Sequence, residues 1–253
     1  MQYGDSMNSF LVGLQFMTRI HLSRQISWAD EEFGKSVKWF PLYGWIIGLF
    51  LCLLHFLLEP FHLPLLQALL LVIGELYISG GTLADGLMDT SDGVFSGRSR
   101  ERCLEIMKDS LIGSYGMLSI LIYMFLSVIS ISYIEDSQLY MLLLAMPVLS
   151  RFNIVISICE YPYARPYGMG KSFSSYRDKY AVEAAAVFAL LPALYFGFSY
   201  LLLAGIAVMT GLGLNRWITG KIGGTTGDTY GFVAETSQAF LALFYVFLTR
   251  GFL

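Results

Sequence analysis

Charged residues are scarce in this chain, and their scarcity limits the class of protein to which it belongs. Only 14% of the 253 residues are Asp, Glu, Lys or Arg, whereas 56% are hydrophobic. A soluble domain carries about 25% charged residues, and apolar runs of roughly 17–25 residues are typical of helices that cross a bilayer. The composition therefore excludes an ordinary soluble domain and predicts a polytopic membrane protein in contact with a lipid bilayer.

Cysteine and histidine are also scarce. The three cysteines are isolated and form no CxxC pair, which argues against a disulfide framework or a zinc site. The three histidines do not cluster, and no stripe of Lys and Arg accompanies the net charge of −3. Because nucleic acids are bound through such basic stripes, we expect no nucleic-acid partner.

The apolar runs predict an all-α bundle of about seven transmembrane helices in a single domain over residues 1–253. These runs are 39–58, 64–78, 117–134, 138–158, 182–197, 199–214 and 232–249. Residues 1–24 differ from them, because Phe10, Leu11, Leu14 and Met17 form an apolar stripe beside polar residues. That pattern predicts an interfacial helix at the membrane surface.

The distribution of basic residues predicts the orientation in the membrane. Seven spans with the N-terminus inside place four polar segments on one face. When Arg151 is counted with its nearer end of the membrane, every one of the 16 Lys and Arg residues except Arg250 lies on that face. The positive-inside rule makes this face cytoplasmic. The segments that meet there are 1–38, 84–116, 159–181 and 215–231.

The acidic stretch at 80–116 carries the strongest chemical signal. Asp85, Asp89 and Asp92 are spaced i, i+4, i+7 and share one face of a helix, and Glu105 and Asp109 form a second pair four residues apart. Crowded carboxylates repel one another unless a cation lies between them, and such oxygen ligands suit Mg²⁺. Charge that directly follows an apolar run is costly and usually functional. We expect a metal site here; a solvated helix face is the alternative.

Basic residues beside these acids suit phosphate oxygens. Arg98, Arg102 and Lys108 belong to this group, although a role in setting membrane topology explains them about equally well. Arg151 lies inside an apolar run and needs either a carboxylate or a phosphate partner. We expect a phosphate. Together the acids and bases indicate metal-assisted phosphoryl transfer.

Two further polar segments belong to the same face. Loop 161–180 contains Arg165 and Lys171 and is too rich in proline and glycine for one continuous helix. Its glycine amides are able to approach a phosphate, although an ordinary loop is an equally good interpretation. Segment 215–231 carries Asp228 among glycines and threonines. The convergence of these segments on one face predicts a single active site.

Four motifs in this order resemble the cobalamin synthase family, the adenosylcobinamide-GDP ribazoletransferases, over essentially the whole chain. They are LQFMTRI (14–20), GGTLADGLMDTSDGVFSGRSRERCLEIMKDSLIGSYG (80–116), YARPYGMG (163–170) and GGTTGDTYG (223–231). The chain departs from the family pattern where a histidine usually precedes the first aspartate, a position occupied here by Leu83. It departs again at His21 and Gln238, whereas the aspartates are intact.

The resemblance implies a Mg²⁺-dependent transferase of cobalamin nucleotide-loop assembly. It would join adenosylcobinamide-GDP to α-ribazole or its 5′-phosphate, release GMP, and form adenosylcobalamin or its 5′-phosphate. The resemblance also implies a multi-pass protein of the bacterial or archaeal cell (inner) membrane with its active site facing the cytoplasm. A homo-oligomer is compatible with the sequence.

For this reaction we assign Asp85, Asp89, Asp92 and Glu105 to Mg²⁺, directly or through water. Asp109 is both a candidate metal ligand and the candidate general base for the ribazole hydroxyl, a role that requires nearby carboxylates to raise its pKa. Asp228 would complete the metal or ribazole site. The phosphates would be held by Arg98, Arg102, Lys108, Arg151, Arg165 and Lys171.

Two other classes of membrane protein are alternatives. Asp89-x-x-Asp92-Gly93 followed by Glu105-x-x-x-Asp109 is also similar to the CDP-alcohol phosphotransferases, but their AR pair after DG is absent here. A transporter would place its charges near the membrane midplane, often in repeated halves. This chain shows no repeat and clusters its charges at one face, so the whole-chain resemblance favours the transferase.

Overall fold

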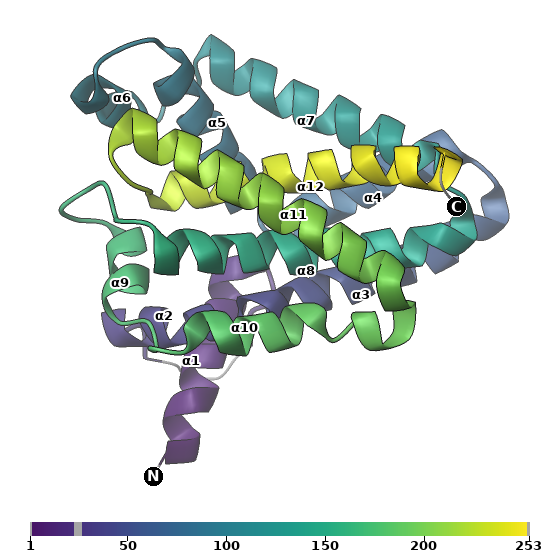
Figure 1. The fold of residues 1–253 in the computed structure, drawn as a ribbon, viewed down its shortest axis with the longest axis horizontal. Helices are drawn as coiled ribbons and strands as arrows, with labels where there is room; N and C mark the ends of the chain where they lie inside the picture. The colour runs from purple at the N-terminus through teal and green to yellow at the C-terminus, as the bar shows by residue number, and fades with distance from the viewer. Residues whose placement is uncertain (1, 23–26, 252–253) are drawn as a thin grey trace.

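The computed structural model describes residues 2–22 and 27–251, and Figure 1 shows a bundle of α-helices. The predicted helical membrane class is confirmed. The helices are α1 (Gln2–Met17), α2 (Asp30–Ser36), the 3-10 turn η1 (Val37–Trp39), α3 (Phe40–Leu58), the 3-10 turn η2 (Glu59–Phe61), α4 (Pro64–Ile78), α5 (Thr82–Phe95), α6 (Arg100–Ile106), α7 (Ser114–Ser132), α8 (Asp136–Glu160), α9 (Met169–Ser175), α10 (Ala181–Leu190), α11 (Ala193–Ile222) and α12 (Gly227–Gly251).

Within the described ranges, five helical segments are long and apolar enough to cross a membrane, and α4 with α5 makes a sixth if that bent pair is one span. The sequence predicted about seven transmembrane helices. The predicted helix that is missing from the spans of the structure is 182–197. There α10 has only 10 residues, which is about half of what a span needs. The chain then turns into α11, whose first residues are separated from the rest by non-helical backbone at Gly197.

Helix α8 lies in the middle of the bundle, with α3, α10, α11 and α12 packed around it (Figure 1). Its contact with α3 is close because α3 has glycine at the interface. A Cβ atom at Gly44 would lie 2.5 Å from the carbonyl oxygen of Pro147, and one at Gly48 would lie 2.9 Å from the side chain of Leu144. Small residues allow backbones to approach in this way where lipid supplies no hydrophobic driving force between helices.

Arg151 of α8 has a carboxylate close to it. Its side chain is fully buried, and Nη1 lies 3.4 Å from Oε1 of Glu75 on α4, which is also buried. On the neighbouring α12, Gln238 donates a hydrogen bond of 3.1 Å to the buried Glu235. Because an arginine in an apolar interior needs a negative partner, Glu75 supplies one, and the phosphate role expected of Arg151 stays a prediction.

The turn between α4 and α5 sets the position of the acidic helix. The two helices are bent by 92° at the break, where Gly80 and Gly81 have φ angles of +77° and +76°. Glycine adopts this left-handed conformation without steric cost. The end of α1 docks at the same corner, since Arg19 donates its backbone N–H to the Ile78 carbonyl at 2.8 Å and its guanidinium lies 5.1 Å from the Tyr77 ring centroid.

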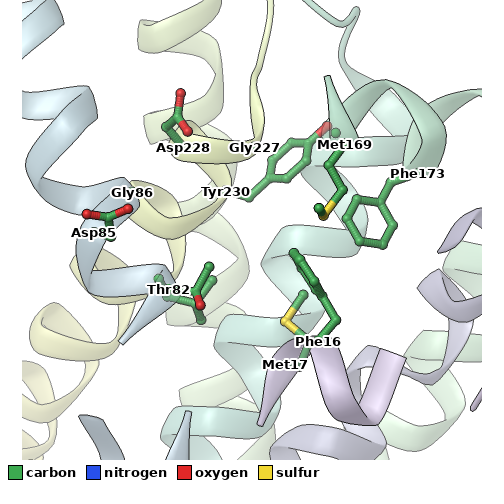
Figure 2. A pocket seen from close by; sticks show the side chains of 12 residues that line it. Phe16, Met17, Thr82, Asp85, Gly86, Met169, Phe173, Gly227, Asp228 and Tyr230 are labelled. Atoms are coloured by element: carbon green, nitrogen blue, oxygen red, sulfur yellow. The ribbon is translucent and has the colours of Figure 1, made fainter. Parts of the chain in front are cut away.

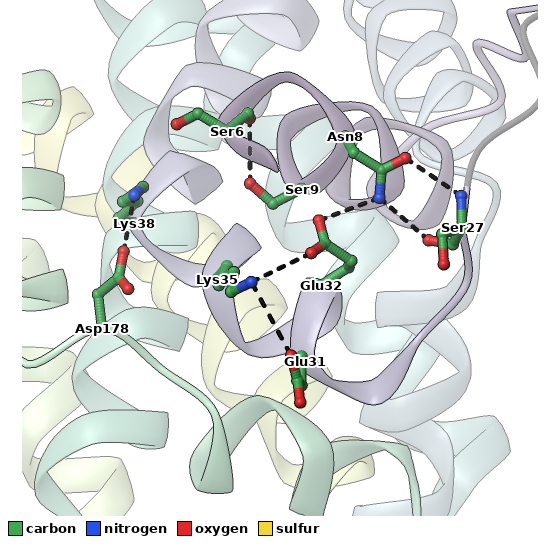
Figure 3. Close-up of polar contacts among 9 residues, drawn as sticks. All are labelled: Ser6, Asn8, Ser9, Ser27, Glu31, Glu32, Lys35, Lys38 and Asp178. Carbon is green, nitrogen blue, oxygen red and sulfur yellow. Dashed lines mark hydrogen bonds and ion pairs between the residues drawn. The ribbon is translucent and has the colours of Figure 1, made fainter. Parts of the chain in front are cut away.

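Helix α1 runs crosswise to the long helices in Figure 1, which is the orientation expected of an interfacial helix. Polar contacts fix it to its surroundings, as Figure 3 shows. Asn8 donates a hydrogen bond to Glu32 of α2 at 3.0 Å, and Lys38 pairs with Asp178, in the segment between α9 and α10, at 2.6 Å. The N-terminal segment is therefore held against the same end of the bundle as loop 161–180.

Candidate active site

The acidic helix α5 and the first turn of α12 lie in backbone contact. A Cβ atom at Gly86 would lie 2.5 Å from the carbonyl oxygen of Asp228, and one at Gly231 would lie 2.3 Å from the carbonyl oxygen of Leu83. Only glycine at these two positions allows such an approach. The glycines in the motifs ADG and DTYG thus bring two aspartate-bearing helices together.

Threonines fix the start of α12. The hydroxyl of Thr229 accepts a hydrogen bond from the Thr226 N–H at 2.8 Å, and the Thr226 hydroxyl accepts one from the Thr229 N–H at 3.3 Å. This reciprocal arrangement resembles a capping box, in which two N–H groups at a helix start are satisfied by side chains. The preceding Thr225 forms a parallel bridge with Tyr163. Segment 223–231 is thereby joined to loop 161–180.

Arg165 is brought to Asp228 by this bridge. Its Nη1 lies 2.8 Å from Oδ2 of Asp228, with only 11% of the arginine side chain exposed. Nε and Nη2 of Arg165 are buried and have no hydrogen-bond partner among the described residues. Beside this pair, burial raises the pKa of Tyr163, so its hydroxyl stays protonated. Arg165 therefore keeps two unused donors for an anion.

Asp85 and Asp228 line one cavity of about 230 Å³ between α1, α5, α9 and α12 (Figure 2). Asp89 follows one helical turn after Asp85 and is half-buried. Its charge is repelled by Asp85 and Asp228, and more weakly by Asp92, and is attracted by Arg165. The structure therefore brings Asp85, Asp89, Asp228 and Arg165 into one electrostatic cluster at one end of the bundle.

Asp92 has a different surrounding from the other two aspartates of α5. Its two carboxylate oxygens accept hydrogen bonds from the backbone N–H groups of Gly113 and Gly116, at 2.7 and 2.8 Å. These groups stand at the start of α7, where N–H groups lack helical partners. Asp92 thus joins α5 to the N-terminus of α7, and its assignment as a metal ligand stays a prediction.

Glu105 and Asp109 do not line the cavity. Both are exposed; Glu105 pairs with Arg102 at 2.8 Å, and Asp109 accepts a hydrogen bond from the Leu111 N–H at 3.1 Å. Exposed pairs three residues apart on a helix contribute little to stability. The structure places this second acidic pair on and after α6, which packs against the C-terminal end of α5 at Gly93.

Apart from the buried Arg151, the other predicted phosphate ligands are exposed side chains: Arg98, Arg102, Lys108 and Lys171. Lys171 follows Gly170, which lines the cavity, whereas Arg98 and Lys108 flank α6. Arg100, in the same basic run, contacts segment 223–231 directly, because a Cβ at Gly223 would lie 2.8 Å from its guanidinium carbon. Of the basic residues assigned to phosphate, Arg165 is the one fixed at the acidic cluster by an ion pair.

The donor set at the cavity fits a small hard cation. In residues 2–22 and 27–251, no three His, Cys, Asp or Glu side chains converge closely enough to hold a metal by themselves. Mg²⁺ is usually bound through one or two carboxylates together with substrate phosphates and waters. Asp85, Asp89 and Asp228 provide that kind of partial site, and Arg165 offsets part of their negative charge.

The far side of the cavity was not identified from the sequence. It is formed by Phe16 and Met17 of α1 and by Met169 and Phe173 of α9 (Figure 2), with Tyr230 of α12 between the two sides. The motif LQFMTRI was interpreted as part of an interfacial helix. LQFMTRI is one of the four motifs that together resemble a single family, and this was the available signal that it also contributes to the site.

The fold and the cavity define a polytopic membrane protein with an acidic site at one end of its helical bundle. The chain belongs to the Cobalamin-5-phosphate synthase family, whose sequence profile matches residues 9–246. No solved structure matches the chain.

Curated relatives match over nearly their whole length. An adenosylcobinamide-GDP ribazoletransferase of Acetivibrio thermocellus is 36% identical over 240 residues, covering 94% of this chain and 97% of the relative. The protein of the same name from Desulfitobacterium hafniense is 36% identical over 245 residues, covering 94% and 96%. That of Alkaliphilus oremlandii is 37% identical over 240 residues, covering 94% and 96%.

Proposed function

We propose that this chain is a Mg²⁺-dependent adenosylcobinamide-GDP ribazoletransferase whose active site is the cavity between α5 and α12. The family and the relatives make it a transferase of cobalamin nucleotide-loop assembly. The observation that carries the site assignment is the cluster of Asp85, Asp89 and Asp228 beside Arg165.

The proposed reaction brings a hydroxyl nucleophile to a negatively charged pyrophosphate, so the site has to neutralise charge. A ribose hydroxyl of α-ribazole, or of its 5′-phosphate, attacks the phosphorus that is bound to the corrinoid side. The new P–O bond forms as the bond to the GMP oxygen breaks, and the hydroxyl proton passes to a base. Mg²⁺, when bound, would neutralise pyrophosphate oxygens. Asp85, Asp89 and Asp228 would hold it, with Asp92 and Glu105 as the further predicted ligands.

Arg165 is suited to bind the pyrophosphate. One of its nitrogens is bonded to Asp228, so the guanidinium is fixed in place. Two others are buried without partners within the described part of the chain, and a planar guanidinium binds phosphate oxygens in a bidentate manner. Lys171, Arg98, Arg102 and Lys108 would add positive charge at the rim.

The general base has two candidates. Asp109 is the one expected from the sequence, and it is exposed outside the cavity. Asp85 lines the cavity itself, where a hydroxyl bound there would be within reach. Near-normal activity of Asp109→Asn would remove Asp109 from the mechanism, and loss of kcat in Asp85→Asn at saturating Mg²⁺ would favour Asp85.

The site would face the cytoplasm of a bacterial or archaeal cell. The basic segments predicted to lie inside meet the cavity through Arg165 and Gly170, which supports this orientation. Labelling of intact cells tests it. A cysteine introduced at Lys171, in a chain otherwise free of cysteine, should resist a membrane-impermeant maleimide until the cells are opened.

Activity is tested by measuring GMP release from adenosylcobinamide-GDP and α-ribazole by the purified protein in detergent. We expect GMP and adenosylcobalamin to form with Mg²⁺, and neither to form with EDTA or with Asp89→Asn. Equal rates with and without a divalent cation would refute the metal assignment. Release of CMP from a CDP-alcohol lipid would instead support the rival enzyme class.

A further inference from the structure

The cavity is too small for either whole substrate. At about 230 Å³ it is below the roughly 300–1,000 Å³ typical of sites that enclose a drug-sized ligand. A space of this size cannot enclose a whole corrinoid or a complete nucleoside diphosphate. One bicyclic ring is of the right size, so a single heterocycle of one of the substrates is the candidate occupant.

The two sides of the cavity differ in chemistry. Asp85 and Asp228 lie on one side, and the opposite side consists of Phe16, Met17, Met169 and Phe173 (Figure 2). The apolar side is an aromatic cluster, because Phe173 packs against Phe16 with ring centroids 5.3 Å apart, and against Phe33 and Phe40 at 5.6 and 5.5 Å. Aromatic and thioether side chains suit the face and edge of a flat apolar ring.

This asymmetry distinguishes the two heterocycles that the proposed reaction offers. The edge of guanine far from its ribose carries a carbonyl and two kinds of N–H group. Against Phe16, Met17 and Phe173 these groups would lose their hydrogen bonds to water without replacement, which is unfavourable. The far edge of a benzimidazole consists of carbon. Its ribose, on the near edge, would extend toward Asp85 and Asp228.

Tyr230 supplies one polar group between the two sides. Its side chain is 4% exposed, and its hydroxyl, although close to Thr225, has no hydrogen-bond partner of normal geometry within the described residues. Figure 2 shows Tyr230 beside Met169 and Phe173. One unpaired donor matches a ring with one free nitrogen acceptor, which is the case for a benzimidazole riboside.

We propose that this cavity is the binding site for the heterocyclic base of the nucleoside substrate, with Phe16, Met17 and Phe173 contacting the ring and Tyr230 donating to its free nitrogen. The proposal rests on the proposed function, from which the nucleoside is taken. The ribose hydroxyl would then be presented to the carboxylates of α5 and α12, and the guanine of the other substrate would lie outside the cavity.

The test measures binding and kinetics in the same variants. Calorimetry of the intact protein in lipid nanodiscs, with α-ribazole alone, is compared for wild type, Phe173→Leu, Tyr230→Phe and the control Phe244→Leu, which replaces a ring on the exposed face of α12. Loss of one hydrogen bond in Tyr230→Phe should weaken α-ribazole binding by about tenfold. Phe173→Leu should weaken it at least as much, and the control should not.

The kinetic measurement separates the two substrates. We expect the KM for α-ribazole to rise in Phe173→Leu and Tyr230→Phe, with the KM for adenosylcobinamide-GDP within about twofold of wild type. A rise confined to the KM for adenosylcobinamide-GDP would place guanine in the cavity and overturn the proposal. Unchanged α-ribazole binding in both variants would overturn it as well. An inactive wild type that still binds α-ribazole through these residues would refute the transferase function alone.

Discussion

The carbonyl oxygen of Asp228 lies only 2.5 Å from the position that the methyl group of an alanine would occupy at Gly86. The contact joins two segments that are far apart in the sequence and sets the spacing between Asp85 and Asp228. A backbone carbonyl cannot move aside as a flexible side chain does. The site therefore depends on the absence of a side chain at position 86 as much as on the carboxylates.

Gly86→Ala tests this contact. The added methyl group should push α5 away from α12, lower the free energy of unfolding by about 1–3 kcal/mol and reduce the rate of GMP release. Thermal unfolding in detergent and the transferase assay measure the two effects. Gly220→Ala is the matched control, because a Cβ atom there meets no atom within 4 Å, and it should leave both quantities near wild type.

Arg165 should be required for turnover rather than for folding. Arg165→Gln removes the ion pair with Asp228 and two buried donors, so kcat should fall by about 10²–10³-fold, as when a donor that stabilises a charged transition state is lost. Lys179→Gln removes an exposed positive charge outside the cavity and should leave kcat unchanged. A similar loss in both variants would show that only the net charge of the loop matters.

Asp89 and Asp92 should respond differently to the same substitution. Asp92→Asn replaces a carboxylate whose two oxygens accept the N–H groups of Gly113 and Gly116, and should cost about 0.5–2 kcal/mol of stability, as the loss of a helix cap does. Asp89→Asn relieves repulsion from Asp85 and Asp228 and should leave the melting temperature unchanged or higher while abolishing activity. Thermal melting curves and GMP-release assays of both variants test this difference. A lower melting temperature for Asp89→Asn would contradict the prediction.

Arg151 should be a structural residue. Arg151→Met leaves Glu75 buried without its partner, which costs about 3–5 kcal/mol for a buried pair. The double variant Glu75→Gln/Arg151→Met removes both charges and should recover a large part of that loss in thermal unfolding. A folded Arg151→Met with a raised KM for adenosylcobinamide-GDP would instead favour the phosphate role that the sequence suggested.

The sequence was sufficient for the class of fold because that class depends on composition and local periodicity. Apolar runs longer than a soluble helix needs, with few charges, specify a helical membrane bundle whatever the tertiary contacts are. The sequence also permitted the bend at Gly80–Gly81, since glycine adopts a positive φ angle without steric cost. The motifs indicated the family, and the family profile agrees.

The sequence was less informative about partners, because a partner is a property of three-dimensional packing. Spacing along α5 groups Asp85, Asp89 and Asp92 equally, yet Asp92 is bound to the start of α7 while Asp85 lines the cavity. A buried arginine can pair with any anion. Arg151 lies beside Glu75 because the fold places α4 next to α8.

Composition and helical periodicity by themselves determined that this chain is a membrane-embedded helical protein with acids and bases gathered at one face. Tertiary structure alone decided which of them meet: it paired Arg165 with Asp228 and brought Phe16 and Phe173 to the acidic cavity. The physical reason is the distance along the chain over which each effect acts. Hydrophobic periodicity acts within one helix, whereas an ion pair or a cavity wall depends on side chains that the fold brings together from distant segments.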